Sequence, residues 1–352
     1  MMKVAVLVSG GVDSSVALQL LKESGQYDIT AFYLKIWLED EFQFLGECPW
    51  EEDLKYARQV CEQAGVPLEV VSLQTAYWDK VVSHTVEELK AGRTPSPDIL
   101  CNQRVKFGAF CDFIDPSFKI ASGHYAQVKE DGGVHKLYKG NDPIKDQTYF
   151  LSRLSQEQLS RCIFPVGQYP KAQVRELAAK FDLTNQSRPD SQGICFLGKI
   201  KYSEFVKAHL GEKPGAIINA DTDEQVGKHK GFWFHTIGQR KGLGLHGGPW
   251  FVTKKDCKNN IIYVSTKKLA EDRPHKEFTV GHVHWLSGQP EATDDLTVKL
   301  RHGEKTIACR LDLSGENGHV TLDEADAGIA AGQYAVFYRG EQCLGSGMIV
   351  NT

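Results

Sequence analysis

The stretch LVSGGVDSSVAL, residues 7–18, constrains the fold of this chain more than any other part of the sequence. The run KVAVLV that leads into it is almost entirely apolar, which is typical of a strand buried on both faces of a sheet. Gly10 and Gly11 then allow a sharp turn, because residues without a Cβ reach backbone conformations that others avoid. An apolar run at helical spacing follows. The chain is therefore expected to begin with a buried strand, a tight turn and a helix.

The turn itself has two interpretations. The helix is expected over residues 14–23, with Asp13 or Ser14 as its N-cap and Gly25 just past its end. A well-capped turn is the simpler interpretation of the glycines. The other is a phosphate site, because the amides and the dipole of a helix N-terminus attract anions. The turn matches neither GxxxxGK[ST] nor GxGxxG.

Strand-like and helix-like runs continue to alternate up to residue 123. Further strands are expected at 28–34, 68–73 and 118–123. Helices are expected at 14–23, 50–65, 76–92 and 102–114. This spacing is typical of βαβ units, so we predict an α/β fold with an open, doubly wound parallel sheet and helices on both faces.

The pattern changes after Gly123. A hairpin is expected around the DGG turn at 131–133, and two helices follow near 155–161 and 170–181. Residues from about 201 to 275 are rich in Gly, Lys and His and show little periodicity, whereas short β-type runs recur from 276 onward. The domains expected from these changes are a catalytic domain at 1–200, a small central domain at 201–275 and a C-terminal β-barrel or sandwich at 276–352.

Charge and hydropathy limit the possible classes of protein. The 352 residues carry a net charge of −4, but residues 145–215 hold 11 basic and 7 acidic side chains. That local excess fits a nucleic-acid face about as well as it fits an ordinary solvated surface. No apolar run approaches the roughly 20 residues of a membrane span, and no leader peptide is visible. We expect a cytoplasmic protein without a membrane partner; an organelle form fits equally well.

The nine cysteines include no CxxC pair, so a structural zinc site has little support and no metal ligands are predicted. Two of them stand in informative surroundings. Cys101 lies near the expected start of a helix, where a thiolate is stabilised, and Asp98 three residues earlier is suited to proton transfer. Cys195 lies in the irregular stretch DSQGICFLG. From spacing alone, a buried, inert thiol is the favoured interpretation of a lone cysteine, and it applies at both positions.

Seven segments in order extend these observations to nearly the whole chain: SGGVDSS, AGRTPSPDILCNQRVKFGAF, ASGHYA, KDQTYFLS, DSQGICFLG, HTIGQRKGLG and GQYAVFYRGEQCLGSG. The first resembles the SGGxDS loop of the ATP pyrophosphatase superfamily. Together they resemble the tRNA-specific 2-thiouridylases, the MnmA or TrmU family. The resemblance implies an N-terminal domain like the adenine-nucleotide alpha hydrolases, a central tRNA-binding domain and a C-terminal β-barrel.

The resemblance also implies a reaction. The family uses ATP to thiolate the wobble uridine of tRNA at C2: the carbonyl oxygen is adenylated, then replaced by sulfur from a cysteine persulfide, and AMP and pyrophosphate are released. By resemblance, Cys195 carries the persulfide. Cys101 either releases its sulfur or forms a disulfide with Cys195 after transfer, and Asp98 acts as acid or base. The sulfur comes from a cysteine desulfurase or a sulfur-relay donor, and Mg²⁺ is expected with ATP.

The family's binding residues carry over by position. Those expected at ATP are Leu7, Val8, Ser9, Gly10, Gly11, Val12, Asp13, Ser14, Leu34 and Gly123. Those expected at the anticodon region of tRNA are Ser96, Pro97, Asp98, His124, Lys145, Asp146, Gln147, Arg301, His302 and Gln333. The family usually has Asn where this chain has Ser96, and a serine lacks the paired donor and acceptor of an amide.

Two other functions remain open from the residues. An AMP-forming ligase of the same superfamily, acting on a small molecule, would share the glycine loop but would not need Cys101 and Cys195. A non-enzymatic RNA-binding protein would not need the loop. The oligomeric state expected is a monomer.

Overall fold

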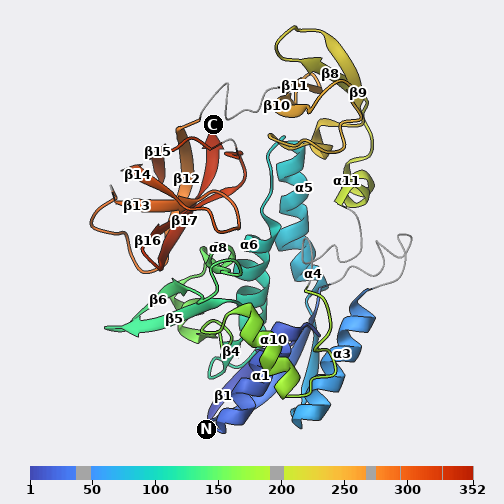
Figure 1. Ribbon diagram of the computed structural model, residues 1–352. Helices are drawn as coiled ribbons and strands as arrows, with labels where there is room; N and C mark the ends of the chain where they lie inside the picture. Colours follow the sequence, from blue (N-terminus) through green and yellow to red (C-terminus); the bar gives the residue numbers. More distant parts are fainter. Residues whose placement is uncertain (37–48, 191–201, 267–274, 294, 327, 352) are drawn as a thin grey trace.

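The computed structural model describes residues 1–36, 49–190, 202–266, 275–293, 295–326 and 328–351. Figure 1 shows three parts: an α/β part that carries the N-terminus, a small β part next to helix α5, and a barrel that contains the C-terminus. The expected boundaries near 200 and 275 adjoin segments outside the described residues.

The N-terminal part is built on a five-stranded parallel sheet, as the alternation of strands and helices predicted. Its strands in spatial order are β3 (Leu68–Ser72), β2 (Tyr27–Lys35), β1 (Met2–Leu7), β4 (Lys119–Ala121) and β7 (Cys162–Ile163). All neighbouring pairs run parallel. The strand order reverses between β1 and β4, because β1 connects forward to β2 on one side while β4 lies on the other.

Helices cover both faces of the sheet, because successive side chains of a strand point to opposite sides. Val4 and Val6 of β1 pack into one core with helices α1 (Val12–Ser24), α3 (Pro49–Ala64) and α10 (Lys171–Lys180). Ala5 and Leu7 pack into a second core on the other face. The helices that this second core packs against the sheet are α4 (Gln74–Tyr77), π-helix η2 (Trp78–Val82), α5 (Ser83–Lys90), α6 (Pro97–Cys101), π-helix η3 (Asn102–Ala109) and α7 (Phe110–Phe113). The same core continues through Leu137, Val336 and Cys343 into the C-terminal part of the chain.

The start of α1 differs from the expectation. Asp13 or Ser14 was predicted as the N-cap, but the helix begins at Val12 and Gly11 occupies the N-cap position without a side-chain cap. The Ser14 hydroxyl instead folds back and donates to the Gly11 carbonyl at 3.0 Å. The prediction was wrong because the helix starts before Asp13 and Ser14, and the Ser14 hydroxyl bonds back to the Gly11 carbonyl instead of capping the helix. Gly25 ends the helix in the left-handed conformation, as expected.

The C-terminal part is a six-stranded antiparallel barrel. Its strands are β12 (Glu277–Trp285), β13 (Leu296–Lys299), β14 (Ile307–Ser314), β15 (Asn317–Leu322), β16 (Tyr334–Arg339) and β17 (Gln342–Asn351). Pairing of β12 with both β15 and β17 closes the barrel. The repeated β-type runs therefore form a barrel rather than an open sandwich.

The predicted hairpin joins the barrel to the N-terminal part. Its strands β5 (Ala126–Asp131) and β6 (Val134–Lys139) extend the barrel's sheet, because β6 pairs with β17. Figure 1 shows the hairpin beneath the barrel. Short helices α8 (Thr148–Leu151) and α9 (Gln156–Arg161) follow the hairpin. The sequence gives no sign of this pairing, since its partners lie about 200 residues apart.

The central part holds a four-stranded sheet that its sequence did not indicate. The elements are α11 (Tyr202–Leu210), β8 (Gly215–Asn219), β9 (Gln225–His229), 3₁₀-helix η4 (Phe232–Phe234), β10 (Phe251–Asp256) and β11 (Ile261–Ser265). The sheet order is β10-β11-β8-β9. Bulges in two of the pairings break the period of two. Among the described helices of the whole chain, none is long and apolar enough to cross a membrane.

Leu137 tests the joint between hairpin and barrel. Its side chain is fully buried and its backbone lies opposite Cys343 of β17. Leu137→Ala should cost about 2–5 kcal/mol of stability and speed amide exchange in β17, because a cavity opens beneath that strand. Hydrogen-exchange mass spectrometry checks this. Leu18→Ala is the control, because Leu18 is equally buried but lies in the other core, so amide exchange in β17 should stay unchanged. Equal acceleration of exchange in β17 by both variants would contradict the claim that Leu137 joins the hairpin to the barrel.

Candidate active site

The glycine loop lies where the strand order of the sheet reverses. In open α/β sheets, ligands bind beyond the carboxyl ends of the strands at this point. Gly10 has φ +76°, and a Cβ there would lie 2.3 Å from the carbonyl oxygen of Asp53. Only glycine fits that position without displacing α3.

Serine side chains hold the loop compact. The Ser9 amide donates to Ser14 Oγ at 3.2 Å, and the hydroxyls of Ser14 and Ser15 donate to the Gly11 carbonyl at 3.0 and 2.9 Å. These bonds fold the loop over the first turn of α1. The amides of that turn and the positive end of the helix dipole therefore face the mouth of the loop, which suits an anion.

Gly123 packs directly on the loop from the end of β4. A Cβ at this glycine would lie 2.6 Å from the Ser14 amide nitrogen and 2.8 Å from the carbonyl carbon of Asp13. Both neighbours are backbone atoms, which cannot swing aside. The sequence predicted that the loop and Gly123 share a nucleotide site; the structure places them in contact.

A second layer of polar side chains supports the loop from the segment after α10. The Asn185 amide donates to the Gly10 carbonyl at 2.8 Å and to Ser15 Oγ at 2.9 Å. Arg188 donates to the same carbonyl at 3.1 Å and forms an ion pair with Asp53. Sequence reasoning missed both residues, because they lie about 175 positions from the loop in a stretch without periodicity.

Asp13 has two donors on the same oxygen. The Tyr125 hydroxyl and Lys171 Nζ lie 2.9 and 2.6 Å from Asp13 Oδ1. Burial, then the charge of Asp13, raises the pKa of Tyr125, so the hydroxyl stays protonated and donates. Lys171 also contacts Asp190 at 2.8 Å. Neither Tyr125 nor Lys171 was predicted, although Tyr125 stands in the quoted ASGHYA segment.

Asp190 gathers three cations. Lys145, Lys171 and Arg175 lie 2.7, 2.8 and 2.5 Å from its carboxylate oxygens. Burial of the carboxyl raises its pKa, but hydrogen bonds from Lys145 and Lys171 outweigh that effect and hold the pKa well below its usual value. The carboxylate is therefore charged at any physiological pH.

The apolar residues predicted at ATP line the loop from within the sheet. The side chains of Leu7, Val8 and Val12 are buried, and Leu34 is half-buried on β2. The Val8 amide donates to the Phe32 carbonyl at 2.9 Å. These side chains pack the sheet, so a nucleotide would meet them mainly through their backbone or, at Leu34, through a partly exposed face.

The helix expected at 102–114, with Cys101 near its start and Asp98 in the loop before it, begins earlier than expected. Ser96 is the N-cap of α6, Pro97 is its first residue, and the helix continues into π-helix η3. Cys101 is 1% exposed in the core that also contains Leu7. Cys195 lies outside the described residues.

The π-helix after Cys101 is stabilised from outside. The Gln158 side-chain amide donates to the carbonyls of Gln103 and Phe107 at 2.9 and 2.7 Å. Stretches of π-helix occur often at functional sites. This geometry fixes the backbone that follows Cys101.

His124 is buried next to the loop. Its Nδ1 lies 2.7 Å from Ser122 Oγ, and its ring packs against Phe107 and Phe164. Burial, with a smaller effect of Lys106, holds the pKa of His124 well below its usual value. The ring is therefore neutral near pH 7, and it can offer RNA a hydrogen bond but no charge.

The three residues of the KDQ segment point in different directions. Lys145 binds Asp190 at 2.7 Å. Asp146 is 1% exposed and pairs with Lys299 of the barrel at 2.8 Å. The Gln147 side chain accepts from the Tyr125 amide at 3.0 Å. All three were predicted at tRNA; the burial of Asp146 favours a structural role for its side chain.

Of the barrel residues predicted at tRNA, His302 lies near this segment. Arg301 is 54% exposed and pairs with Asp326 at 3.1 Å, and the His302 ring stacks on Phe150 with centroids 4.7 Å apart. Burial lowers the pKa of His302. Gln333 is half-buried at the start of β16, where its carbonyl accepts from the Ile349 amide.

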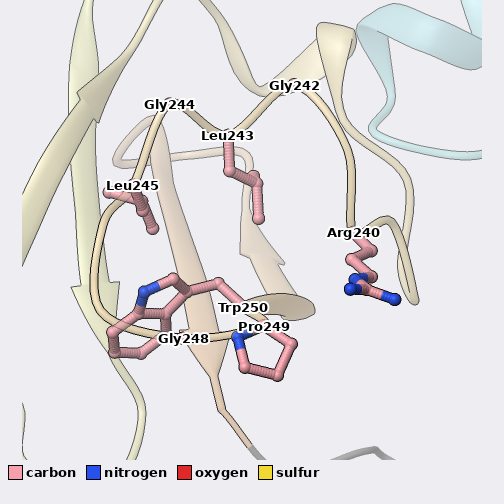
Figure 2. A pocket seen from close by; sticks show the side chains of 8 residues that line it. All are labelled: Arg240, Gly242, Leu243, Gly244, Leu245, Gly248, Pro249 and Trp250. Atoms are coloured by element: carbon pink, nitrogen blue, oxygen red, sulfur yellow. The ribbon is translucent and has the colours of Figure 1, made fainter.

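A separate hollow of about 420 Å³ lies in the central part. Its lining residues are Arg240, Gly242, Leu243, Gly244, Leu245, Gly248, Pro249 and Trp250. Figure 2 shows Leu245 and Trp250 on one side and Arg240 on the other, with the Leu243 side chain between them. The hollow offers a cation and an aromatic ring on one glycine-rich loop. Within the described ranges, no three His, Cys, Asp or Glu side chains gather as a metal site would require.

The fold and the loop together define a class: a HUP-type α/β domain followed by two β domains. Family models match the chain in that order, as a tRNA methyl transferase HUP domain over 2–199, a tRNA methyl transferase PRC-barrel domain over 203–266 and an aminomethyltransferase beta-barrel domain over 275–349.

Curated relatives narrow the class to a family. The tRNA-specific 2-thiouridylase MnmA of Parabacteroides distasonis is 45% identical, with 99% of both chains covered. MnmA 2 of Bacteroides fragilis is 44% identical over 99% of this chain and 100% of the relative, and MnmA of Porphyromonas gingivalis is 44% identical over 99% of both. The chain belongs to the tRNA-specific 2-thiouridylase family, as the seven segments indicated.

Gly123 gives a direct test of the loop as a nucleotide site. Gly123→Ala should weaken binding of a non-hydrolysable ATP analogue by more than about tenfold, because the added methyl group must displace the first turn of α1. Isothermal titration calorimetry measures this. Gly132→Asn is the control, since its Cβ meets nothing within 4 Å and asparagine tolerates a positive φ. Equal affinity in all three proteins would contradict the assignment.

Proposed function

We propose that the protein is an ATP-dependent tRNA 2-thiouridylase that acts on the wobble uridine. The observation that carries this proposal is near-full-length identity of 44–45% with curated 2-thiouridylases. It is supported by a loop suited to phosphate at the switch point of the sheet and by helix α6, which contains Asp98 and places Cys101 in the same core as Leu7.

The first half-reaction would activate the base. In the proposed step, the uridine C2 oxygen attacks the α-phosphorus of ATP and pyrophosphate leaves, which converts a poor leaving group into AMP. Loop amides and the α1 dipole would stabilise the charge that builds on the phosphates. The Asp13 carboxylate of the loop would help to hold a Mg²⁺ ion bound with ATP, and that ion would neutralise charge on the phosphates.

The second half-reaction would deliver sulfur. The terminal sulfur of a persulfide on Cys195 attacks C2, and AMP leaves with the original oxygen. Cys101 could act before or after this attack: it either cleaves the Cys195 persulfide first and releases hydrosulfide, which then attacks C2, or it cleaves the S–S bond of the C2–S–S–Cys195 link after the attack. Both routes leave a Cys101–Cys195 disulfide, which a thiol reductant reopens. Asp98 would move protons at the base. A cysteine desulfurase or a sulfur-relay donor would reload Cys195.

RNA would bind across the other two parts. Half-exposed Arg301 and the stacked ring of His302 offer a cation and an aromatic face on the barrel. Arg240 and Trp250 offer the same combination in the central hollow. Ser96 and Pro97, at the start of α6, would meet the target base beside Asp98.

Replacing the cysteines tests the sulfur chemistry. Cys195→Ser and Cys101→Ser should each lower 2-thiouridine to below about one per cent of wild type, because neither hydroxyl can carry or cleave a persulfide. Mass spectrometry of digested tRNA measures the product. Cys111→Ser is the matched control, because Cys111 lies in α7 and no proposed step uses its thiol. Normal thiolation by Cys195→Ser would contradict the mechanism.

Pyrophosphate exchange separates this function from that of a small-molecule ligase. Exchange of labelled pyrophosphate into ATP that requires tRNA supports the proposal. Exchange that requires an amino acid, and proceeds without tRNA, would assign the chain's activity to the ligase class.

A further inference from the structure

We propose that the tripeptide 145–147 couples the ATP loop to the barrel, so that RNA on the barrel tightens ATP binding. This inference rests on the proposed function. It gives the tripeptide a positioning role, which differs from the direct tRNA contacts expected from its sequence. Each of its three side chains reaches a different part of the molecule.

The first connection runs to the barrel. Asp146 and Lys299 form an ion pair at 2.8 Å, with side chains 1% and 2% exposed. The Thr148 hydroxyl lies 2.9 Å from both carboxylate oxygens of Asp146 and 3.1 Å from the Tyr338 hydroxyl. A buried pair of this kind cannot separate without leaving a charge uncompensated, so the two parts move together at this point.

The second connection runs to the loop through Tyr125. The Gln147 side chain accepts from the Tyr125 amide, and the Gln147 amide donates to the Tyr125 carbonyl, both at 3.0 Å. These two bonds fix the backbone of Tyr125, whose hydroxyl donates to Asp13 Oδ1 at 2.9 Å. A displacement of Gln147 therefore changes the position of a loop carboxylate.

The third connection reaches the same oxygen by another path. Lys145 binds Asp190 Oδ2 at 2.7 Å, and Lys171 lies between Asp190 Oδ1 at 2.8 Å and Asp13 Oδ1 at 2.6 Å. Charged side chains make every step of this path. The second and third connections thus meet at Asp13, within the loop expected to hold the phosphates.

The barrel end of the coupling lies beside the residues proposed to meet RNA. Lys299 is the last residue of β13, and Arg301 and His302 follow it. The His302 ring stacks on Phe150, three residues beyond the tripeptide. RNA that binds Arg301 and His302 would restrain the end of β13, and through Lys299 it would restrain Asp146.

Restraint of the tripeptide is expected to favour ATP. With Lys145 and Gln147 held, Lys171 and Tyr125 keep Asp13 in one position, so ATP binding requires less ordering of the loop. Coupling between two binding sites is reciprocal, so ATP must tighten RNA binding by the same factor. A contact that only stabilises the fold would not make the affinity for one ligand depend on the other, so a measured change in affinity distinguishes coupling from such a contact.

The test measures affinity for a non-hydrolysable ATP analogue, with and without an unmodified tRNA transcript that has a wobble uridine. Wild-type protein should bind the analogue at least about fivefold more tightly with tRNA. The double variant Asp146→Asn/Lys299→Met, which removes both buried charges together, should reduce this factor to less than about twofold. Lys145→Gln should also reduce the gain in affinity that tRNA produces. Because Lys145 is half-exposed, this variant replaces the double variant in the test if the double variant does not fold.

Arg153→Met is the matched control. Arg153 also connects the two parts, since it donates to the carbonyls of His282 and Ser346 at 2.7 and 3.3 Å, but it makes no described contact with the tripeptide. It should keep the wild-type factor. Equal loss in Arg153→Met would attribute the effect to docking of the barrel in general and overturn the proposal.

Two other results would overturn the proposal as well. One is that tRNA leaves the affinity of the wild-type protein for the ATP analogue unchanged. The other is that the double variant and Lys145→Gln both keep the full wild-type gain in affinity with tRNA. Thiolation by the wild-type protein is measured in parallel. Absence of 2-thiouridine contradicts the proposed function, whereas normal thiolation without any change in affinity contradicts only the coupling.

Discussion

The close contact between Gly123 and the first turn of α1 is the constraint on which the rest of the site depends. It requires β1 and β4 to be neighbours, so the strand order must reverse there. It also brings Tyr125 within reach of Asp13, since both residues adjoin the contact. The position of the proposed nucleotide site follows from the topology of the sheet rather than from any one side chain.

Polar contacts between residues far apart in the sequence connect this site to other parts of the chain. Asn185 and Arg188 hold the Gly10 carbonyl from one side, and Lys171 holds Asp13 from the other. The buried pair of Asp146 and Lys299 attaches the barrel. The proposed reaction brings ATP, RNA and sulfur together over two half-reactions, and such attachment would help it, because the reacting groups have to be positioned together.

The sequence predicted the local features well and the distant ones poorly. Strand and helix positions in the α/β part, the hairpin and the barrel strands depend on periodicity and turn residues, which are local. The N-cap of α1 was wrong because a fold-back of Ser14 replaced ordinary capping. The central sheet was missed because bulges break its period. The supports at Asn185, Arg188 and Lys171 and the pairing of β6 with β17 depend on packing across more than 150 residues, which no local pattern encodes.

The central claim is that the uridine oxygen leaves as part of AMP. A tRNA transcript that carries ¹⁸O at C2 of its uridines tests this claim most directly. After one round of thiolation, mass spectrometry of the AMP should find one ¹⁸O atom in its phosphate for each 2-thiouridine formed. AMP without ¹⁸O, released alongside thiolated tRNA, would contradict the account, because the oxygen would then have left by another route.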